Sequence, residues 1–333
     1  MTAGFQYGVR LAGTGSAVPP RVLSNADLEK MVDTSDEWIV QRTGIRERRI
    51  VGQGVEDTAT LSRDALARAL EAAEMSAGDL DLIIIGCCTQ ESTVPSTACR
   101  VAAMLGLDST GGFDLLAGCS GFVYALNLAD SLIRSGRHRT IGVVGCDVLS
   151  NITDYSDRSL CILFGDAAGA AVLTRDDDPS RGCIFQSLEA DGTRWETLYL
   201  PHEERQVPEW DRNNPIKLGC LRMQGREVYK FAVNKFREVI ENALVATGLE
   251  VDDIAQFICH QSNARIIESA KEKIGLPDEK VLINIDRYGN TSAGSVGLCL
   301  DELVRGGKIK QGDAIVLVAF GAGLTWASSV WRV

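Results

Sequence analysis

Three residues of the 333-residue chain combine a reactive side chain with a position where chemistry is common. Cys119 lies between glycines in AGCSGF, His260 directly follows the apolar segment 256–259, and Asn290 lies in the loop sequence DRYGNTSAGSVG. A cysteine can attack a carbonyl carbon, while imidazole and carboxamide groups can donate hydrogen bonds to developing negative charge. Together these residues predict nucleophilic catalysis through a covalent intermediate.

Cys119 is predicted to lie at the start of a helix. Segment 113–136 is typical of a strand, a tight turn and a helix, because its later apolar residues follow helical spacing. Unpaired amides and the helix dipole at such a start favour a thiolate, the reactive form of cysteine. Gly118 and Gly121 permit a tight turn and close approach of a substrate. The alternative is a buried structural cysteine, which we expect for most of the other nine.

Of the three histidines, His260 is the one whose position favours a catalytic role. It falls at the C-terminal end of a strand predicted over 256–259, where α/β folds tend to place chemistry. His138 and His202 lie in charged segments and are interpreted as surface residues. A satisfied core histidine is the alternative for His260, and a helix cap is the alternative for Asn290.

Composition excludes several classes of protein. The 34 basic and 45 acidic residues give a net charge of −11, so the overall field repels nucleic acid and anionic membrane. The longest apolar runs fall far below the roughly 20 residues of a transmembrane helix. No secretory signal is visible, so the ten cysteines are expected to be reduced in a cytoplasmic protein. No Cys-x-x-Cys pair occurs, and we expect no metal site.

An internal repeat organises the chain. Residues 70–85 align without gaps on 244–259, and both segments have the pattern helix, Asp-containing turn, buried strand. Further on, 160–173 resembles 315–330, which predicts an apolar strand, a Phe-Gly turn and a second strand in each segment. The chain is therefore predicted to consist of two similar halves.

The boundary between the halves falls near the charged segment 174–182 and predicts domains 1–176 and 177–333. Helices alternate with short β-branched strands in each half, which indicates parallel strands covered by helices. Two such halves packed together predict a layered α/β/α/β/α sandwich. Segment 191–218, rich in proline and tryptophan, is expected to run over the surface near a site entrance.

The chain resembles the β-ketoacyl-acyl-carrier-protein synthase III family, whose members are condensing enzymes of the thiolase fold. The resemblance runs nearly end to end. It rests on the segments TSDEWIVQRTGIRERRI (34–50), GCSGF (118–122), FGDAAGAAVL (164–173), HQSNARI (260–266), GNTSAGS (289–295) and FGAGLTWAS (320–328). It implies a duplicated five-layer α/β sandwich, a homodimer, and no metal or redox cofactor.

The resemblance also implies a reaction. Cys119 would accept an acyl group from an acyl-CoA primer, and malonyl-acyl carrier protein would lose CO2 and attack the acyl-enzyme. His260 and Asn290 would donate hydrogen bonds to the thioester oxygen during decarboxylation. Backbone amides of Cys119 and Ala322 would bind the other oxyanion. The product would be 3-oxoacyl-acyl carrier protein, the first product of fatty acid biosynthesis.

Binding residues carried over by the resemblance form three sets. Those expected to contact CoA are Thr34, Trp38, Arg42, Arg158 and Asn263. Phe320 would shield the site, and Val94, contributed across the dimer, would line the acyl pocket. Segment 212–237, with seven basic residues and one acidic residue, has a charge of +6 and would dock the acidic carrier protein through Arg226 and Lys230, together with Arg265.

Several alternatives remain open on sequence alone. The order Cys, His, Asn also occurs in papain-like hydrolases, but the Cys-Gly-Ser-Cys-Trp context is absent. A condensing enzyme of a specialised pathway and an inactive heterodimer partner are further alternatives. Acetyl-CoA is the first candidate primer. The small Val94 leaves room for longer or branched primers.

Overall fold

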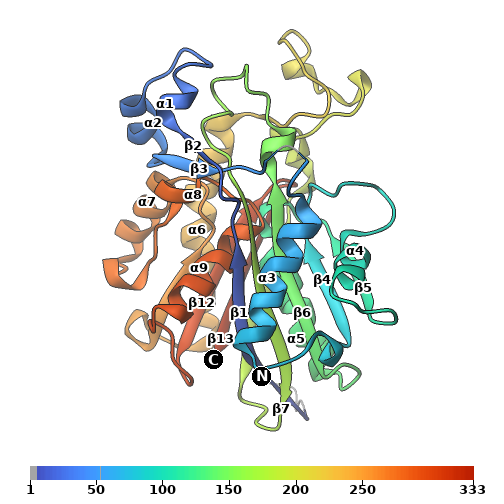
Figure 1. Ribbon diagram of the computed structural model, residues 1–333. Coiled ribbons are helices and arrows are strands. Elements are labelled where there is room, and N and C mark those ends of the chain that lie inside the picture. The colour runs from blue at the N-terminus through green and yellow to red at the C-terminus, as the bar shows by residue number, and fades with distance from the viewer. Residues whose placement is uncertain (1–5, 53) are drawn as a thin grey trace.

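The computed structural model describes residues 6–52 and 54–333, so the first five residues of the predicted N-terminal half lie outside it. Two central sheets stand side by side, with helices between them and on both outer faces (Figure 1). This arrangement is the duplicated five-layer α/β/α/β/α sandwich that the repeat and the resemblance predicted.

The first sheet is built from the N-terminal part of the chain. Its strand order is β1 (Gly8–Ala17), β7 (Asp166–Asp176), β6 (Thr140–Val148), β4 (Leu82–Gly86) and β5 (Gly111–Leu115). β4 runs parallel to β5 and β6, whereas β7 is antiparallel to both β1 and β6. β6 is buried along its whole length, including its acidic residue Asp147.

The second sheet repeats the plan with fewer strands. Its order is β11 (Ile254–Cys259), β12 (Ala314–Gly321), β13 (Thr325–Arg332) and β8 (Gly182–Ala190). β11 and β12 are parallel, and the remaining pairs are antiparallel. The expectation of parallel strands is therefore correct only for the strands that are connected to one another through helices. The other neighbours make both sheets mixed.

Helices fill the three remaining layers. α3 (Thr58–Ala72) and α4 (Thr97–Met104) cover the outer face of the first sheet, and α6 (Gly225–Thr247) and α7 (Ala264–Ile274) lie on the outer face of the second. α5 (Gly121–Arg134) and α9 (Gly294–Arg305) lie between the sheets, where Phe122 and Val296 belong to one apolar cluster with strands of both.

Short elements surround the ends of the sheets. They are α1 (Asn25–Leu28), α2 (Asp36–Thr43), α8 (Ile285–Tyr288), the strand pair β2 (Val22–Ser24) and β3 (Glu47–Arg49), and the strand pair β9 (Leu198–Tyr199) and β10 (Arg222–Met223). Segment 191–218 extends from one end of the molecule, as Figure 1 shows in yellow, and includes β9. Among the described residues, no helix has the length and apolar character to cross a membrane.

The predicted strand at 160–163 is wrong. These residues form turns, and β7 pairs with β6 instead. Leu160 is nonetheless buried, because it packs with Leu149 and Phe164 in a small apolar cluster. A short apolar run therefore signalled burial here without a strand, an ambiguity that periodicity alone does not resolve.

Candidate active site

Cys119 lies in a tight turn between β5 and α5, as predicted from its flanking glycines. Gly118 has φ +54°, and a Cβ there would come within 2.8 Å of the Ala322 backbone nitrogen. Similarly, a Cβ at Gly321 would come within 2.4 Å of the Cys119 backbone nitrogen. The glycines therefore allow the turn after β12 to pack directly on the cysteine turn. This packing brings the backbones of Cys119 and Ala322 together.

The electrostatics at Cys119 differ from the sequence-based expectation of a thiolate. Burial raises the pKa of the Cys119 thiol to about 12, and the nearby Asp147 carboxylate acts in the same direction. A hydrogen bond donated by the Ser292 hydroxyl over 3.2 Å acts in the opposite direction. Desolvation therefore exceeds the effect of the helix start, and the resting residue is a thiol at neutral pH.

His260 begins the segment that follows β11, and its side chain is only 1% exposed. Burial lowers its pKa to about 3, so the imidazole is neutral at neutral pH. The Ser295 hydroxyl accepts a hydrogen bond from the Gln261 backbone and lies 2.9 Å from His260 Nδ1. That hydroxyl can therefore donate its own proton to Nδ1, which leaves the imidazole proton on Nε2 as a neutral donor.

Asn290 lies in the loop between α8 and α9 and is 7% exposed. Its Oδ1 accepts a hydrogen bond of 2.9 Å from the Ser292 backbone nitrogen. The backbone of Asn290 pairs with that of Phe164 in an isolated parallel β-bridge. Because Oδ1 is engaged, Nδ2 is the part of the amide that can serve as a donor.

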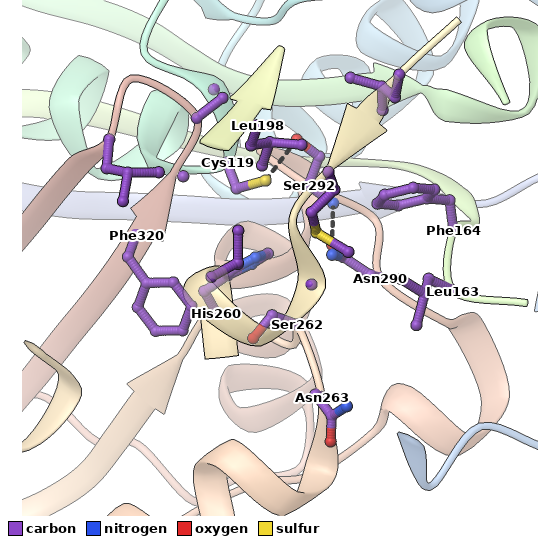
Figure 2. A pocket seen from close by; sticks show the side chains of 18 of the residues that line it. Cys119, Leu163, Phe164, Leu198, His260, Ser262, Asn263, Asn290, Ser292 and Phe320 are labelled. Carbon is purple, nitrogen blue, oxygen red and sulfur yellow. Dashed lines mark hydrogen bonds between the residues drawn. The ribbon is translucent and has the colours of Figure 1, made fainter. Parts of the chain in front are cut away.

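A single pocket brings the three predicted residues together (Figure 2). Cys119, His260 and Asn290 all line it. Phe320 also lines it, with its ring centroid 5.4 Å from that of His260 in an edge-on arrangement. The remaining walls are mainly apolar and include Leu149, Leu163, Phe164, Leu198, Leu221 and Met223. Such walls exclude water and fit an acyl chain.

Of the predicted CoA residues, Asn263 lines this pocket. The Trp38 ring has the guanidinium carbons of Arg158 and Arg42 at 5.4 and 5.8 Å from its centroid. Asn263 caps α7 and donates a hydrogen bond to the Arg42 carbonyl at 3.1 Å. Thr34 precedes α2, and its Oγ1 is buried with no partner among the described residues. All five residues therefore cluster around α2 and the start of α7.

Val94 is not part of the pocket in a single chain. Its side chain is 80% exposed and is absent from the residues that line the cavity. Phe113 and Leu116, on and after the edge strand β5, are exposed as well. The predicted role of Val94 therefore depends on a second copy of the chain.

The basic segment 212–237 presents less free charge than its composition predicted. Arg222 is buried in a bidentate ion pair with Asp211, and Lys230 pairs with Glu227 at 2.8 Å. Lys235 and Arg237 pair with glutamates on α6 as well. The +6 thus overstates the local field. Arg226 and Arg265 are exposed and have no ion pair within the described ranges.

Three site residues were missed by sequence reasoning. Ser292 contacts both Cys119 and Asn290, Ser295 contacts His260, and Asp147 ends the buried strand β6. Asp147 did carry a sequence signal, since an acidic residue in the apolar run VVGCDV is unusual unless it has a function. The two serines carried none, because only the fold shows which way they point.

All ten cysteines are free thiols. Most are at least partly buried, as predicted, but Cys99 on α4 is exposed. Within residues 6–52 and 54–333, no group of three or more His, Cys, Asp or Glu is arranged to hold a metal ion.

The raised pKa of Cys119 predicts slow alkylation at neutral pH. Iodoacetamide reacts with thiolates, so the rate should rise about tenfold per pH unit and show no plateau below about pH 10. Mass-spectrometric quantification of the Cys119 peptide from pH 6 to 10 measures this, and Cys119→Ala gives the background alkylation of exposed thiols such as Cys99. A plateau near pH 7 would show that the thiolate is already present.

Comparison with known proteins identifies the family. Residues 113–192 match 3-oxoacyl-[acyl-carrier-protein (ACP)] synthase III, and residues 244–333 match its C-terminal family. A β-ketoacyl-[acyl-carrier-protein] synthase III of Caldanaerobacter subterraneus subsp. tengcongensis is 47% identical over 320 residues, 96% of each chain. The crystal structure of 3-oxoacyl-[acyl-carrier-protein] synthase III from Aquifex aeolicus VF5 is 43% identical, covers 98% of this chain and 100% of that one, and has a TM-score of 0.90.

A priming β-ketosynthase from the R1128 polyketide biosynthetic pathway is also similar, with 35% identity, 99% and 98% coverage and a TM-score of 0.89. The matches to synthase III extend over both halves of the fold and include the cysteine, histidine and asparagine segments. The chain therefore belongs to the β-ketoacyl-acyl-carrier-protein synthase III family of condensing enzymes.

Proposed function

We propose that the chain catalyses the decarboxylative condensation of an acyl-CoA primer with malonyl-acyl carrier protein. The products are 3-oxoacyl-acyl carrier protein, CO2 and CoA, and the reaction initiates fatty acid biosynthesis. One observation carries the proposal: a thiol, a neutral imidazole and a carboxamide line the same apolar pocket in a chain of this family. The papain-like alternative does not agree with the two-sheet fold or with the family.

Each of the three residues has a role in one half of the reaction. Cys119 attacks the primer thioester, and the Cys119 and Ala322 backbone amides stabilise the oxyanion. His260 Nε2 and Asn290 Nδ2 donate to the malonyl thioester oxygen while CO2 leaves. Two neutral donors suit this task, since a charged imidazolium would require a pKa far above the value of about 3 that burial imposes on His260.

Mass spectrometry tests the function directly. Mixing the protein with acetyl-, isobutyryl- and octanoyl-CoA in competition should give an acyl adduct on the Cys119 peptide, and later addition of malonyl-acyl carrier protein should discharge it. The acyl group that is attached to Cys119 in the largest amount identifies the preferred primer. Absence of an adduct with every acyl-CoA would exclude the proposed reaction.

Trp38→Ala is expected to raise the KM for acyl-CoA by about 5- to 30-fold with little change in kcat. Trp38 and Arg158 are proposed to hold the adenine between an aromatic face and a guanidinium, an interaction of about 1–2 kcal/mol. An N-acetylcysteamine thioester of the same acyl group provides the control because it lacks adenine. Equal losses with both donors would mean that Trp38 stabilises the fold and does not contact CoA.

Charge reversal at Arg226 and Arg265 is expected to raise the KM for malonyl-acyl carrier protein by about tenfold at low salt. Arg265 and Tyr229 line a shallow surface hollow, and Tyr229 also lines the catalytic pocket, so a carrier docked there can extend its arm inward. Lys230→Glu should have a smaller effect because Lys230 is already paired with Glu227.

Arg137→Glu is the matched control for these variants, since it changes an exposed arginine beyond the far end of α5, about 20 Å of helix from Cys119. High salt should shrink the effect of the docking variants. Unchanged kinetics with the carrier protein in all three variants would remove this surface from the proposal.

Finer features also remain proposals. The exposed Val94, Phe113 and Leu116 support a homodimer in which Val94 reaches the partner's pocket. Acetyl-CoA stays the first candidate primer, although the leucine-rich walls favour a longer chain as the alternative. The similarity to a polyketide priming synthase keeps a specialised pathway open. The cytoplasmic location and the division into 1–176 and 177–333 are retained as predictions.

A further inference from the structure

Asp147 is a buried acid that the proposed mechanism leaves unused. It lies at the end of β6 with 0% exposure, and no ion pair reaches it in the described ranges. Its Oδ1 accepts hydrogen bonds from the Cys88 backbone at 2.7 Å and the Thr89 hydroxyl at 3.1 Å, and its Oδ2 accepts from the Ala293 backbone at 3.3 Å. A buried carboxylate with only neutral partners is costly, and such groups concentrate at functional sites.

Ser292 connects this carboxylate to the nucleophile. Its hydroxyl lies 3.2 Å from Cys119 Sγ, a contact that Figure 2 marks with a dashed line. Asp147 Oδ2 accepts a hydrogen bond from the backbone N–H of Ala293, the residue directly after Ser292, and the Ser292 hydroxyl acts to lower the pKa of Asp147. Ser292 has φ +49°, a backbone conformation that serine rarely adopts. Strained residues of this kind persist at sites where their placement matters.

We propose that Ser292 and Asp147 form a proton path from Cys119, in which Asp147 stores the proton of the thiol while Cys119 carries the acyl group. The inference rests on the proposed function, since it concerns the acylation of Cys119. His260 is a poor alternative acceptor, because burial opposes its protonation and no hydrogen bond joins it to the sulfur in the part of the chain that the structure describes.

The path balances over the two half-reactions. As the Cys119 sulfur bonds to the acyl carbon, its proton passes to Ser292 Oγ and the Ser292 proton passes to Asp147. The bond from the acyl carbon to CoA breaks, and the CoA thiolate takes a proton from solvent. In the second half, decarboxylation supplies the carbanion that displaces Cys119, and the released thiolate recovers the proton of Asp147 through Ser292.

Titratable groups around Asp147 limit where else that proton could go. Cys87, Cys88, Cys119 and Cys146 are thiols whose pKa values the Asp147 charge helps to raise, and the buried Asp166 carboxylate is a further neighbour that it influences. No lysine, arginine or histidine among the described residues is hydrogen-bonded to Asp147. Neutralising Asp147 during acylation thus removes an unpaired buried charge.

Proton counting tests storage directly. Without storage, transfer of the acyl group from CoA moves the thiol proton of Cys119 to CoA and takes up none from solvent. With storage, about one proton is taken up per acyl-enzyme formed. The measurement mixes the full-length protein with acetyl-, isobutyryl- or octanoyl-CoA, whichever acylates fastest, in weak buffer at pH 7 with an indicator dye, and scores the adduct by mass spectrometry.

Ser292→Gly breaks the path with little harm to the backbone, because glycine accepts φ +49° and keeps the N–H that holds Asn290. We expect its acylation to slow on the order of 10²-fold and its proton uptake to vanish, while malonyl decarboxylation is retained. Ser328→Ala removes a buried hydroxyl on β13 that has no hydrogen-bond partner among the described residues; it is the matched control and should behave as the parent.

Asp147→Asn is a second test of the path and should also lose proton uptake if it folds. Cys119→Ala corrects for protons moved by substrate binding alone. Zero uptake in the parent protein, or a full proton retained in Ser292→Gly, would overturn the proposal. An acyl adduct that forms without proton uptake would contradict proton storage but not the proposed condensing function, because that function predicts only the adduct.

Discussion

Cys119→Ala is expected to abolish acyl-enzyme formation and to reduce condensation by roughly 10⁴-fold or more, while malonyl decarboxylation continues. In the proposed mechanism Cys119 takes part only in acyl transfer, whereas His260 and Asn290 act on the malonyl thioester. The substitution removes a thiol in contact with Ser292 and leaves the hydrogen bond between Ser292 and Asn290 in place. The decarboxylation site should therefore survive.

The measurement pairs intact-protein mass spectrometry after acyl-CoA addition with CO2 release from malonyl-acyl carrier protein. Cys99→Ala, which removes an exposed thiol on α4, is the matched control and should acylate normally. Cys88 also lines the pocket, so peptide mapping is needed to locate any adduct. An adduct that persists on Cys119→Ala would assign the nucleophile to a different residue.

The architecture was accessible from sequence because duplication repeats a local pattern. The alignment of 70–85 with 244–259 predicted two helix-turn-strand units, and each occurs, as α3 followed by β4 and as α6 followed by β11. The helix predicted from apolar spacing in segment 113–136 also occurs, as α5. These features depend on periodicity within a short segment, which sequence reports well.

The strand directions and the basic segment depended on more distant contacts. β7 is antiparallel to β6 although both halves alternate helices and strands, because only a short 3-10 helix and turns, and no α-helix, connect these two strands. The charge of Arg222 is paired with Asp211 and is not free at the surface. Asp211 lies eleven residues away, just outside the segment whose charge was counted. Counting charges along a segment cannot include partners that folding brings in from elsewhere.

The electrostatics of the nucleophile were mispredicted for the same physical reason. A helix start and flanking glycines are local features, and they favour a thiolate. Burial raises the Cys119 pKa, and the pocket that Cys119 lines includes residues of β9, β10 and the turn after β12, which lie in the other half of the sequence. Reactivity must therefore be gained when substrate binds, through proton removal and the amides that receive the oxyanion.

His260→Ala and Asn290→Ala are each expected to reduce malonyl decarboxylation by about 10²- to 10³-fold, the cost of losing one oxyanion donor, or about 3–4 kcal/mol. Acylation of Cys119 should persist in both, since neither side chain is hydrogen-bonded to the sulfur within the described residues. In the double variant the fold-reduction in decarboxylation should be smaller than the product of the two single reductions. Both donors act on one oxygen, and a single remaining donor already works poorly.

The pH dependence of decarboxylation distinguishes a neutral His260 hydrogen-bond donor from a charged imidazolium. Since burial holds the pKa of His260 near 3, decarboxylation should be flat between pH 5 and 8, where the imidazole stays neutral and keeps its Nε2 proton. A rate that falls as pH rises through 6–7 would mean that a charged imidazolium is required, which would contradict the neutral donor. His260→Gln tests the same point by geometry: its amide can donate but cannot titrate, so any activity it restores over His260→Ala must come from hydrogen bonding.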